Sequence, residues 1–188
     1  MTINKKITET SVRIGLVRFS YVHVFERKKP MDGKTEGKYS VSILIPKTDT
    51  ETIKLINEAV EAAKLKGKSE KWGGKIPGNV KSPLRDGDVE REDDEAYAGM
   101  YFINASSDRK PQVRVKDGGQ IYEAIEDDDF YSGCWGAVTL NFFPYDASGN
   151  RGVGAGLNNL LKMKDGDKLS GGRSAEEDFG DLGDDCLS

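Results

Sequence analysis

A long run of β-branched and aromatic residues near the N-terminus, residues 12–26 (VRIGLVRFSYVHVFE), constrains the fold more than any other segment. Successive side chains of a strand point to opposite faces, so apolar residues of one parity share a face. The apolar parity changes near residues 17–19, which predicts a β-bulge or a strand that curls as barrel strands do. The two predicted faces carry Val12, Ile14 and Leu16 on one side, and Phe19, Tyr21 and Phe25 on the other.

One helix is predicted among several further strand-like runs. It covers residues 48–64, with Thr48, Asp49 and Thr50 as candidate N-caps and Gly67 at its end. Five to seven strands, one main α-helix and long loops indicate a mainly β chain. We therefore expect an OB-fold-like five-stranded or slightly elaborated barrel. The other strands are predicted at residues 39–45, 97–105, 112–116, 133–145 and 152–163.

Negative charge is concentrated at the C-terminus, where residues 174–188 hold six carboxylates and neither Lys nor Arg. Such a segment buries too little apolar surface to offset its ordering entropy, so we expect a disordered tail after a domain of residues 1–173. Without these six carboxylates the net charge of −4 becomes +2. Acidic tails commonly bind partners, whereas a merely solubilising terminus is the alternative. The tail residues singled out for partner binding are Glu176, Glu177, Asp178, Phe179, Asp181, Asp184 and Asp185.

Signatures of enzymes and cofactor sites are weak. The chain lacks the GxSxG, GxxxxGK[ST] and HExxH motifs and has one histidine, His23. The carboxylates of residues 86–95 lack the spacing of a calcium loop and are interpreted as a solvated acidic loop, and residues 127–129 likewise. We expect no enzyme activity, no cofactor and no metal. Two distant cysteines, Cys134 and Cys186, and no signal peptide or membrane span indicate a cytoplasmic protein.

Aromatic residues interleave with basic ones along the predicted strands and loops. Single-stranded nucleic acid needs this combination, because its bases stack on rings while its phosphates need cations. The helix carries few cations, which disfavours a reader of duplex DNA. Trp72 lies in a lysine-rich glycine loop, residues 64–81, without apolar neighbours in sequence, so we expect it to be available for stacking. Phosphate contacts are predicted from Arg18, Lys71, Lys75, Arg109, Lys110 and Arg114, and base stacking from Tyr21, Trp72, Tyr101, Trp135 and Phe143.

Four segments together resemble a family of phage-encoded single-stranded DNA-binding proteins that was long known only as a domain of unknown function. The resemblance covers about residues 10–170 and implies an OB-fold protein with an acidic C-terminal tail. It implies a protein that coats single-stranded DNA without sequence specificity during phage DNA replication, recombination and repair, in the cytoplasm of the infected host cell. The tail would modulate DNA binding and recruit polymerase or helicase, and the protein would be a monomer or weak dimer. The segments are VRIGLVRFSYVHVFE, GKYSVSILIPK, YAGMYFINASSDRKPQV and GCWGAVTLNFFPYDASGNRGVGAGLNNLLKMKDGDKL.

Two other classes of protein remain open at this point. The first is an interaction module that does not bind DNA and whose acidic surface mimics DNA or serves assembly. The second is a metal-dependent nuclease that uses the carboxylates of residues 86–95. The interleaving of lysine and aromatic residues favours the DNA-coating hypothesis over both.

Overall fold

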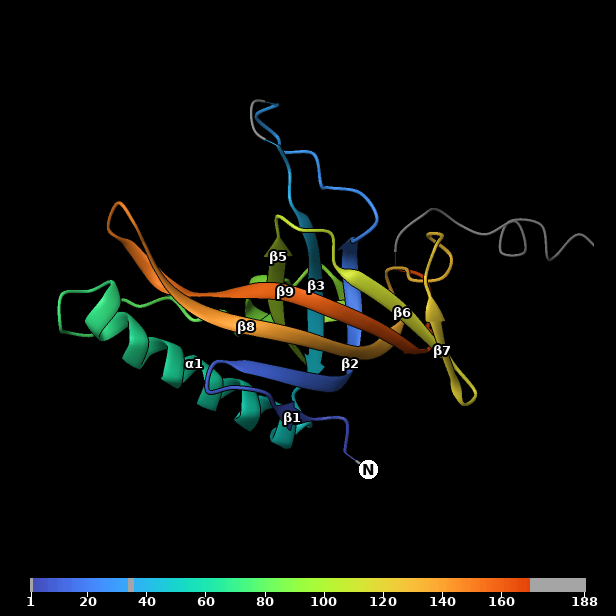
Figure 1. Cartoon of the computed structure of the whole chain (residues 1–188), viewed down its shortest axis with the longest axis horizontal. Coiled ribbons are helices and arrows are strands. Elements are labelled where there is room, and N and C mark those ends of the chain that lie inside the picture. Colours follow the sequence, from blue (N-terminus) through green and yellow to red (C-terminus); the bar gives the residue numbers. More distant parts are fainter. Residues whose placement is uncertain (1, 34–35, 170–188) are drawn as a thin grey trace, which may run out of the picture.

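The computed structural model describes residues 2–33 and 36–169. A curved sheet with the long helix α1 against one side makes up most of it (Figure 1). The predicted tail, residues 174–188, lies outside the described residues. Within the described part of the chain, no helix is both long and apolar enough to cross a membrane.

Five strands form a ring, as expected for an OB-like barrel. They are β2 (Ser11–His23), β3 (Tyr39–Pro46), β5 (Met100–Ser107), β8 (Trp135–Ala147) and β9 (Asn150–Lys164). Antiparallel pairs join β2 to β3, β3 to β5, β2 to β8 and β8 to β9. The ring closes where β5 and β9 run parallel, and the mainly β, OB-like prediction is confirmed.

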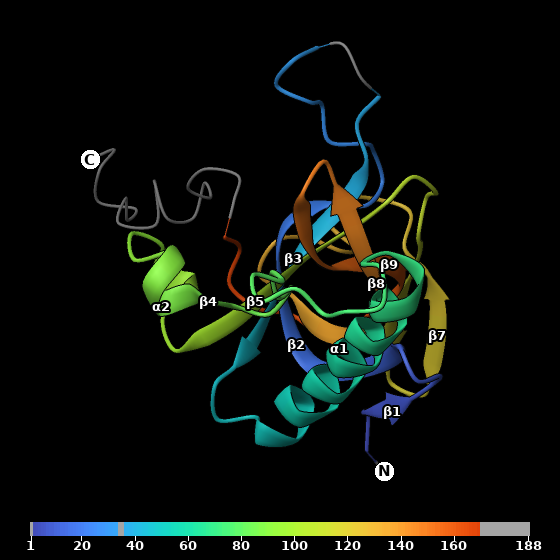
Figure 2. The same cartoon turned by 90° about the vertical axis from the view of Figure 1, so that its left-hand side faces the viewer.

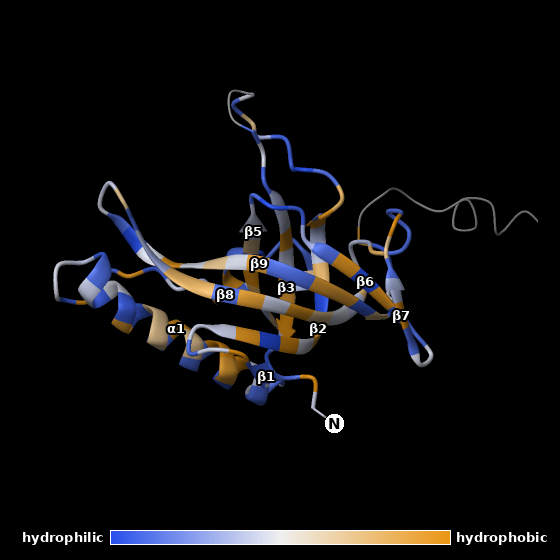
Figure 3. Cartoon of the chain, in the orientation of Figure 1, coloured by the Kyte–Doolittle hydropathy of each residue, from blue (hydrophilic) through white to orange (hydrophobic). Residues whose placement is uncertain are grey.

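The seam between β5 and β9 is narrow, because only Ser106 and Gly156 are register partners there. Beyond it, β9 pairs in parallel with β6 (Gln112–Asp117), which pairs with β7 (Gln120–Glu123). Hydrophobic and hydrophilic residues alternate along β6, as expected for a strand with one covered face (Figure 3). The remaining short elements are β1 (Lys5–Lys6), β4 (Arg85–Asp86), α2 (Gly87–Glu90) and the 3-10 helix η1 (Glu95–Tyr97).

The predicted change of parity in β2 is confirmed. Its register against β8 shifts between Ile14 and Val17. Ile14 is fully buried on one side of this irregularity, and Val17 and Phe19 are fully buried on the other. Leu16 was predicted to share a face with Val12 and Ile14, but it does not, because the bulge turns Val17 inward at this point of the strand.

Helix α1 (Thr50–Glu70) begins as predicted, because the Asp49 side chain accepts a hydrogen bond from the backbone N–H of Thr52 at 3.2 Å. The prediction that Gly67 ends the helix is wrong. Gly67 lies inside the helix, where a Cβ atom would stand 2.6 Å from Trp72 and 2.7 Å from Pro144. Glycine is thus required here by close packing.

The expectation that Trp72 lacks apolar neighbours is also wrong. Its side chain is 7% exposed and packs in the main core. The indole Nε1 donates a hydrogen bond to the backbone oxygen of Tyr145 at 3.2 Å. Pro144, which lies near it, belongs to β8, far along the chain, so the residues around Trp72 did not indicate this burial.

A second, smaller apolar cluster covers part of the outer face of the ring. It consists of Leu44, Tyr97 and Phe102. The predicted strand over residues 97–105 therefore starts late, because Tyr97 belongs to η1 and folds back over the sheet. Its hydroxyl donates to Ser42 Oγ at 2.9 Å, and Figure 2 shows α2 and β4 beside β5, apart from α1.

Candidate nucleic-acid interface

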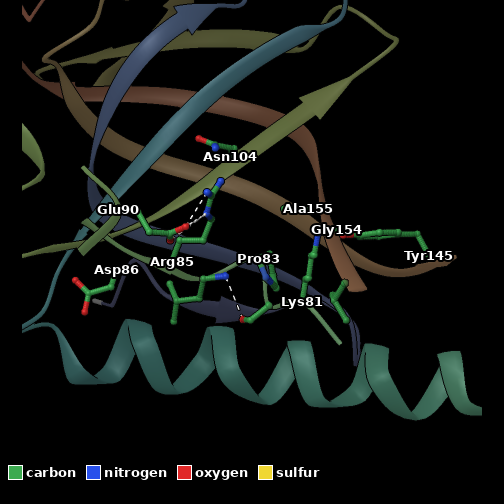
Figure 4. Close-up of a pocket in the computed structure, with 12 residues that line it drawn as sticks. Lys81, Pro83, Arg85, Asp86, Glu90, Asn104, Tyr145, Gly154 and Ala155 are labelled. Atoms are coloured by element: carbon green, nitrogen blue, oxygen red, sulfur yellow. Dashed lines mark hydrogen bonds and ion pairs between the residues drawn. The ribbon is translucent and has the colours of Figure 1, made fainter. Parts of the chain in front are cut away.

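Two hollows that share Asn104 lie along the outer face of the ring and form what we call the outer groove. The first has a volume of about 660 Å³ and is drawn in Figure 4. The second has a volume of about 370 Å³. The first is lined by Lys81–Asp86, Glu90, Asn104, Tyr145 and Val153–Ala155, and the second by Tyr21, His23, Lys28, Ser40–Ser42, Arg91 and Asn104–Ser106.

Aromatic side chains of β8 lie over glycines of β9 beside the first hollow. Phe143 is the register partner of Gly154, and Tyr145 is the partner of Gly152. A Cβ atom on Gly154 would stand 2.6 Å from the Phe143 ring, and one on Gly152 would stand 2.6 Å from the Tyr145 hydroxyl oxygen. Phe143 remains 43% exposed. The alternating glycines therefore let one side of each ring rest on backbone.

Arg91 carries an available positive charge in the second hollow. Its guanidinium carbon lies 6.0 Å from the ring centre of Tyr21, 5.9 Å from that of Tyr97 and 5.7 Å from that of Phe102. No described carboxylate forms an ion pair with it within 4.0 Å. Contact with rings holds such a guanidinium in place. Its charge helps to lower the pKa of Glu90, but no ion pair neutralises it.

Arg85 differs from Arg91 because its charge is paired. It lies 2.7 Å from Glu90, whose pKa is lowered by this hydrogen bond and charge (Figure 4). It also stands 5.1 Å from the ring centre of Phe102. Arg85 therefore fixes α2 against β5 and contributes little net charge to the first hollow.

Four of the seven carboxylates in residues 86–95 hold this segment together, whereas Glu92, Asp93 and Glu95 are exposed, as expected for a solvated loop. Lys47 Nζ lies 2.7 Å from both Asp86 and Asp88. The hydrogen bonds from Lys47 and from the Gly99 N–H lower the pKa of Asp88. Asp94 caps η1 by accepting from Ala96 N at 3.1 Å. The described residues contain no group of three or more His, Cys, Asp or Glu side chains placed to hold a metal ion.

Basic loops stand at both ends of the outer groove. At the second hollow, Arg27 donates to the backbone oxygen of Asp108 at 2.8 Å, so the loop that follows β2 lies beside the predicted Arg109 and Lys110. At the first hollow, the bond between Trp72 and Tyr145 brings the chain around Lys71 and Lys75 near Tyr145, which with Phe143 forms what we call the aromatic ledge. These four lysines and arginines are exposed.

Other predicted residues lie away from the groove. Tyr101 has the parity opposite to Asn104 on β5 and faces α1, with Lys47 Nζ 5.1 Å from its ring centre. Arg114 lies on β6, with Arg13 and Ile121 in a different hollow. Arg18 covers the ring of Trp135 at 5.7 Å and donates to the backbone oxygens of Gly133 and Asp167.

Sequence reasoning missed several residues of the outer groove, above all Arg85, Arg91 and Asn104. Arg85 and Arg91 were hidden in or next to the acidic stretch, where the surrounding carboxylates dominate the pattern. One signal could have revealed the aromatic ledge. In a hairpin that turns at Ser148–Gly149, residues equally far from the turn are paired across the two strands. This pairs the larger side chains of one strand with glycines of the other: Asn141 with Gly156, Phe143 with Gly154 and Tyr145 with Gly152.

The closed five-strand ring and its aromatic, cationic outer groove place the chain among OB-like proteins, a class in which such grooves hold single-stranded nucleic acid. Within that class, residues 10–187 match the family described as Enterobacter phage Enc34, ssDNA-binding protein, and the chain belongs to this family. The resemblance inferred from the sequence is thereby confirmed.

Individual relatives agree with this assignment. Protein p50 of Acyrthosiphon pisum secondary endosymbiont phage 1 is 31% identical over 181 residues, which cover 91% of this chain and 93% of p50. The single-stranded DNA-binding protein from bacteriophage Enc34, solved in complex with ssDNA, has a TM-score of 0.73 and 26% identity over 90% of this chain and 98% of that one. The gp2.5 single-stranded DNA-binding protein of bacteriophage T7 has a TM-score of 0.59 over 94% of this chain and 97% of that one, and at 14% identity it shows the fold alone.

Proposed function

We propose that this chain binds single-stranded DNA along the outer groove and coats it without sequence preference, as a non-catalytic protein. The observation that carries the proposal is the aromatic ledge, in which Tyr145 lines the outer groove and Phe143 lies over Gly154 at its border, together with the unpaired Arg91 in the same groove. Every base has a π-face, and stacking on an aromatic ring contributes about 1–3 kcal/mol per base. The Enc34 relative, which was solved with ssDNA, supports the same ligand.

The basic loops at the two ends of the groove suggest a path for the DNA backbone. Bases would stack on Phe143 and Tyr145 at one end and on Tyr21 at the other. Trp72 is excluded from this role, because a buried indole would have to leave the core to meet a base. The phosphate contacts that we assign are those of Lys28, Lys71, Lys75, Arg91, Arg109 and Lys110.

The test is a fluorescence-anisotropy titration of a labelled dT oligonucleotide at 50 and 200 mM salt. We expect tight binding that weakens steeply with salt, because each phosphate contact releases counterions. Phe143→Ala should weaken binding, whereas Arg114→Gln, which lines neither hollow of the outer groove, should leave it nearly unchanged. No binding at 50 mM salt, with or without residues 174–188, would overturn the proposal.

The biological setting that we propose is phage DNA replication, recombination and repair in the cytoplasm of the infected cell, by a monomer or weak dimer. The acidic residues 174–188 would compete with DNA for the groove and recruit polymerase or helicase. Deleting them should then tighten binding, and most at low salt, because screening limits the reach of charge to about 8 Å at 0.15 M. Unchanged affinity of the deletion variant at 20 mM salt would contradict this competition.

The alternative of a DNA-mimicking interaction module has less support. A mimic would display its carboxylates, whereas three of the seven in residues 86–95 are paired, Asp86 and Asp88 with Lys47 and Glu90 with Arg85. The acidic segment instead holds Arg91 against the outer face of the sheet.

A further inference from the structure

The second hollow of the outer groove has the composition of an anion site. Its lining contains two permanent cations, Lys28 and Arg91, and no carboxylate. Within residues 2–33 and 36–169, neither cation forms an ion pair within 4.0 Å. Asp94, which does not line the hollow, lies close to it, because its Oδ2 accepts from the Tyr21 hydroxyl at 3.5 Å.

Neutral hydrogen-bond donors complete this lining. Ser40 on β3 and Ser106 on β5 are register partners, and both line the hollow. Ser42 is already engaged, because its oxygen accepts from Tyr97. The hollow therefore offers hydroxyl groups of Ser40 and Ser106, together with the Asn104 amide, between two charged groups. Phosphate oxygens are commonly bound by such hydroxyl, amide and cationic groups.

We propose that this hollow is a phosphate subsite, which holds one internucleotide phosphate of the DNA between Lys28 and Arg91 with Ser40 and Ser106 as hydrogen-bond donors. The inference rests on the proposed function and gives the two hollows different ligands. The first hollow binds bases on the ledge of Phe143 and Tyr145, and the second binds the sugar–phosphate backbone of the DNA. The volume of about 370 Å³ leaves room for a phosphate with part of its sugar.

His23 provides an internal probe of this subsite. It is the single histidine of the chain and lines the hollow on β2. Partial burial, and next the charge of Lys28, lower its pKa. A phosphate bound beside it would raise that pKa, because the negative charge favours the imidazolium form. The charged or titratable groups around His23 are Tyr21, Lys28 and Arg91 in this hollow, and Glu26, Asp127, Asp128, Tyr131 and Lys168 in the adjoining one.

The test is an NMR pH titration of the His23 ring in untagged full-length protein, free and saturated with a dT oligonucleotide. We expect the oligonucleotide to raise the midpoint by about 1 pH unit. This rise should be smaller in Lys28→Gln and in Arg91→Gln, because each variant lacks one of the two cations that would hold the phosphate. Lys28 lies on an exposed loop, so its replacement should not impair folding. Lys116→Gln, exposed on β6 outside both hollows, serves as the matched control and should keep the full rise.

A second arm uses inorganic phosphate in place of DNA, at constant ionic strength against chloride. A rise only with the oligonucleotide identifies an internucleotide phosphate as the ligand, whereas an equal rise with millimolar phosphate identifies a site for free phosphate and overturns the assignment. If the oligonucleotide binds by anisotropy but leaves the His23 midpoint unchanged, the subsite is wrong while DNA binding stands. If no oligonucleotide binds, both the proposed function and the internucleotide assignment fail.

Discussion

Gly154→Ala tests the aromatic ledge without removing an aromatic ring. The new Cβ atom would stand 2.6 Å from Phe143 Cζ and 2.8 Å from Cε2, where ordinary contact begins at 3.4 Å. The ring must therefore shift by about 0.8 Å or swing off the strand, since the Gly154 backbone beneath it is held by pairing with β8. If a base stacks on this ring, displacement should cost much of the stacking energy of about 1–3 kcal/mol, or about 5- to 150-fold in Kd.

The assay is anisotropy with a labelled dT oligonucleotide at 150 mM salt, on Gly154→Ala, Phe143→Ala and the double variant. Because both single changes remove the same platform, the double variant should lose little more than either one. Gly119→Ala is the matched control, since nothing lies within 4 Å of its added Cβ atom. Wild-type affinity for Gly154→Ala, or fully additive losses in the double variant, would refute the reasoning.

Three further predictions concern stability and reactivity. Trp72→Ala should lower the free energy of unfolding by about 3–5 kcal/mol in urea titrations, because the buried indole fills core space; a loss below 1 kcal/mol would contradict its burial. Lys47→Met should lower Tm at pH 6 through loss of its bonds to Asp86 and Asp88. Since Lys47 lowers the pKa of Asp88, the Tm difference from wild type should shrink as pH falls below about 4, and a constant difference would count against the ion pair. Burial raises the pKa of Cys134 to about 11, so a Cys186→Ser variant should react with a thiol reagent at pH 8 only after unfolding, and rapid native labelling would exclude burial.

Local patterns in the sequence predicted much of the fold. The bulge in β2 followed from a change of apolar parity, and the start of α1 followed from the Asp49 cap, because both depend on neighbours in sequence. The end of α1 was missed because Gly67 is required by close packing that includes Pro144 of β8, a contact distant in sequence.

The candidate site was less accessible to such reasoning. Tyr21 and Phe143 were identified as rings on strands, and the structure places both beside the outer groove. Arg91 was missed because its orientation depends on distant rings, and Trp72 was misassigned because its burial depends on β8. Alternation along one strand predicts which residues share a face of that strand. Which residues of different strands lie together depends on the strand pairing of the whole ring.

The two parallel pairings of β9 have a consequence for the loop that joins its partners. Ser106 pairs with Gly156, and Gln112 pairs with Asn159. The six residue steps from Ser106 to Gln112 therefore lie beside only three residue steps of β9. Three steps of strand span about 10 Å, whereas six could span about 20 Å. The surplus chain, which includes Arg109 and Lys110, must therefore arch away from the sheet. Its length could change by insertion or deletion while both ends stay fixed, so the reach of these two cations is set independently of the ring of strands.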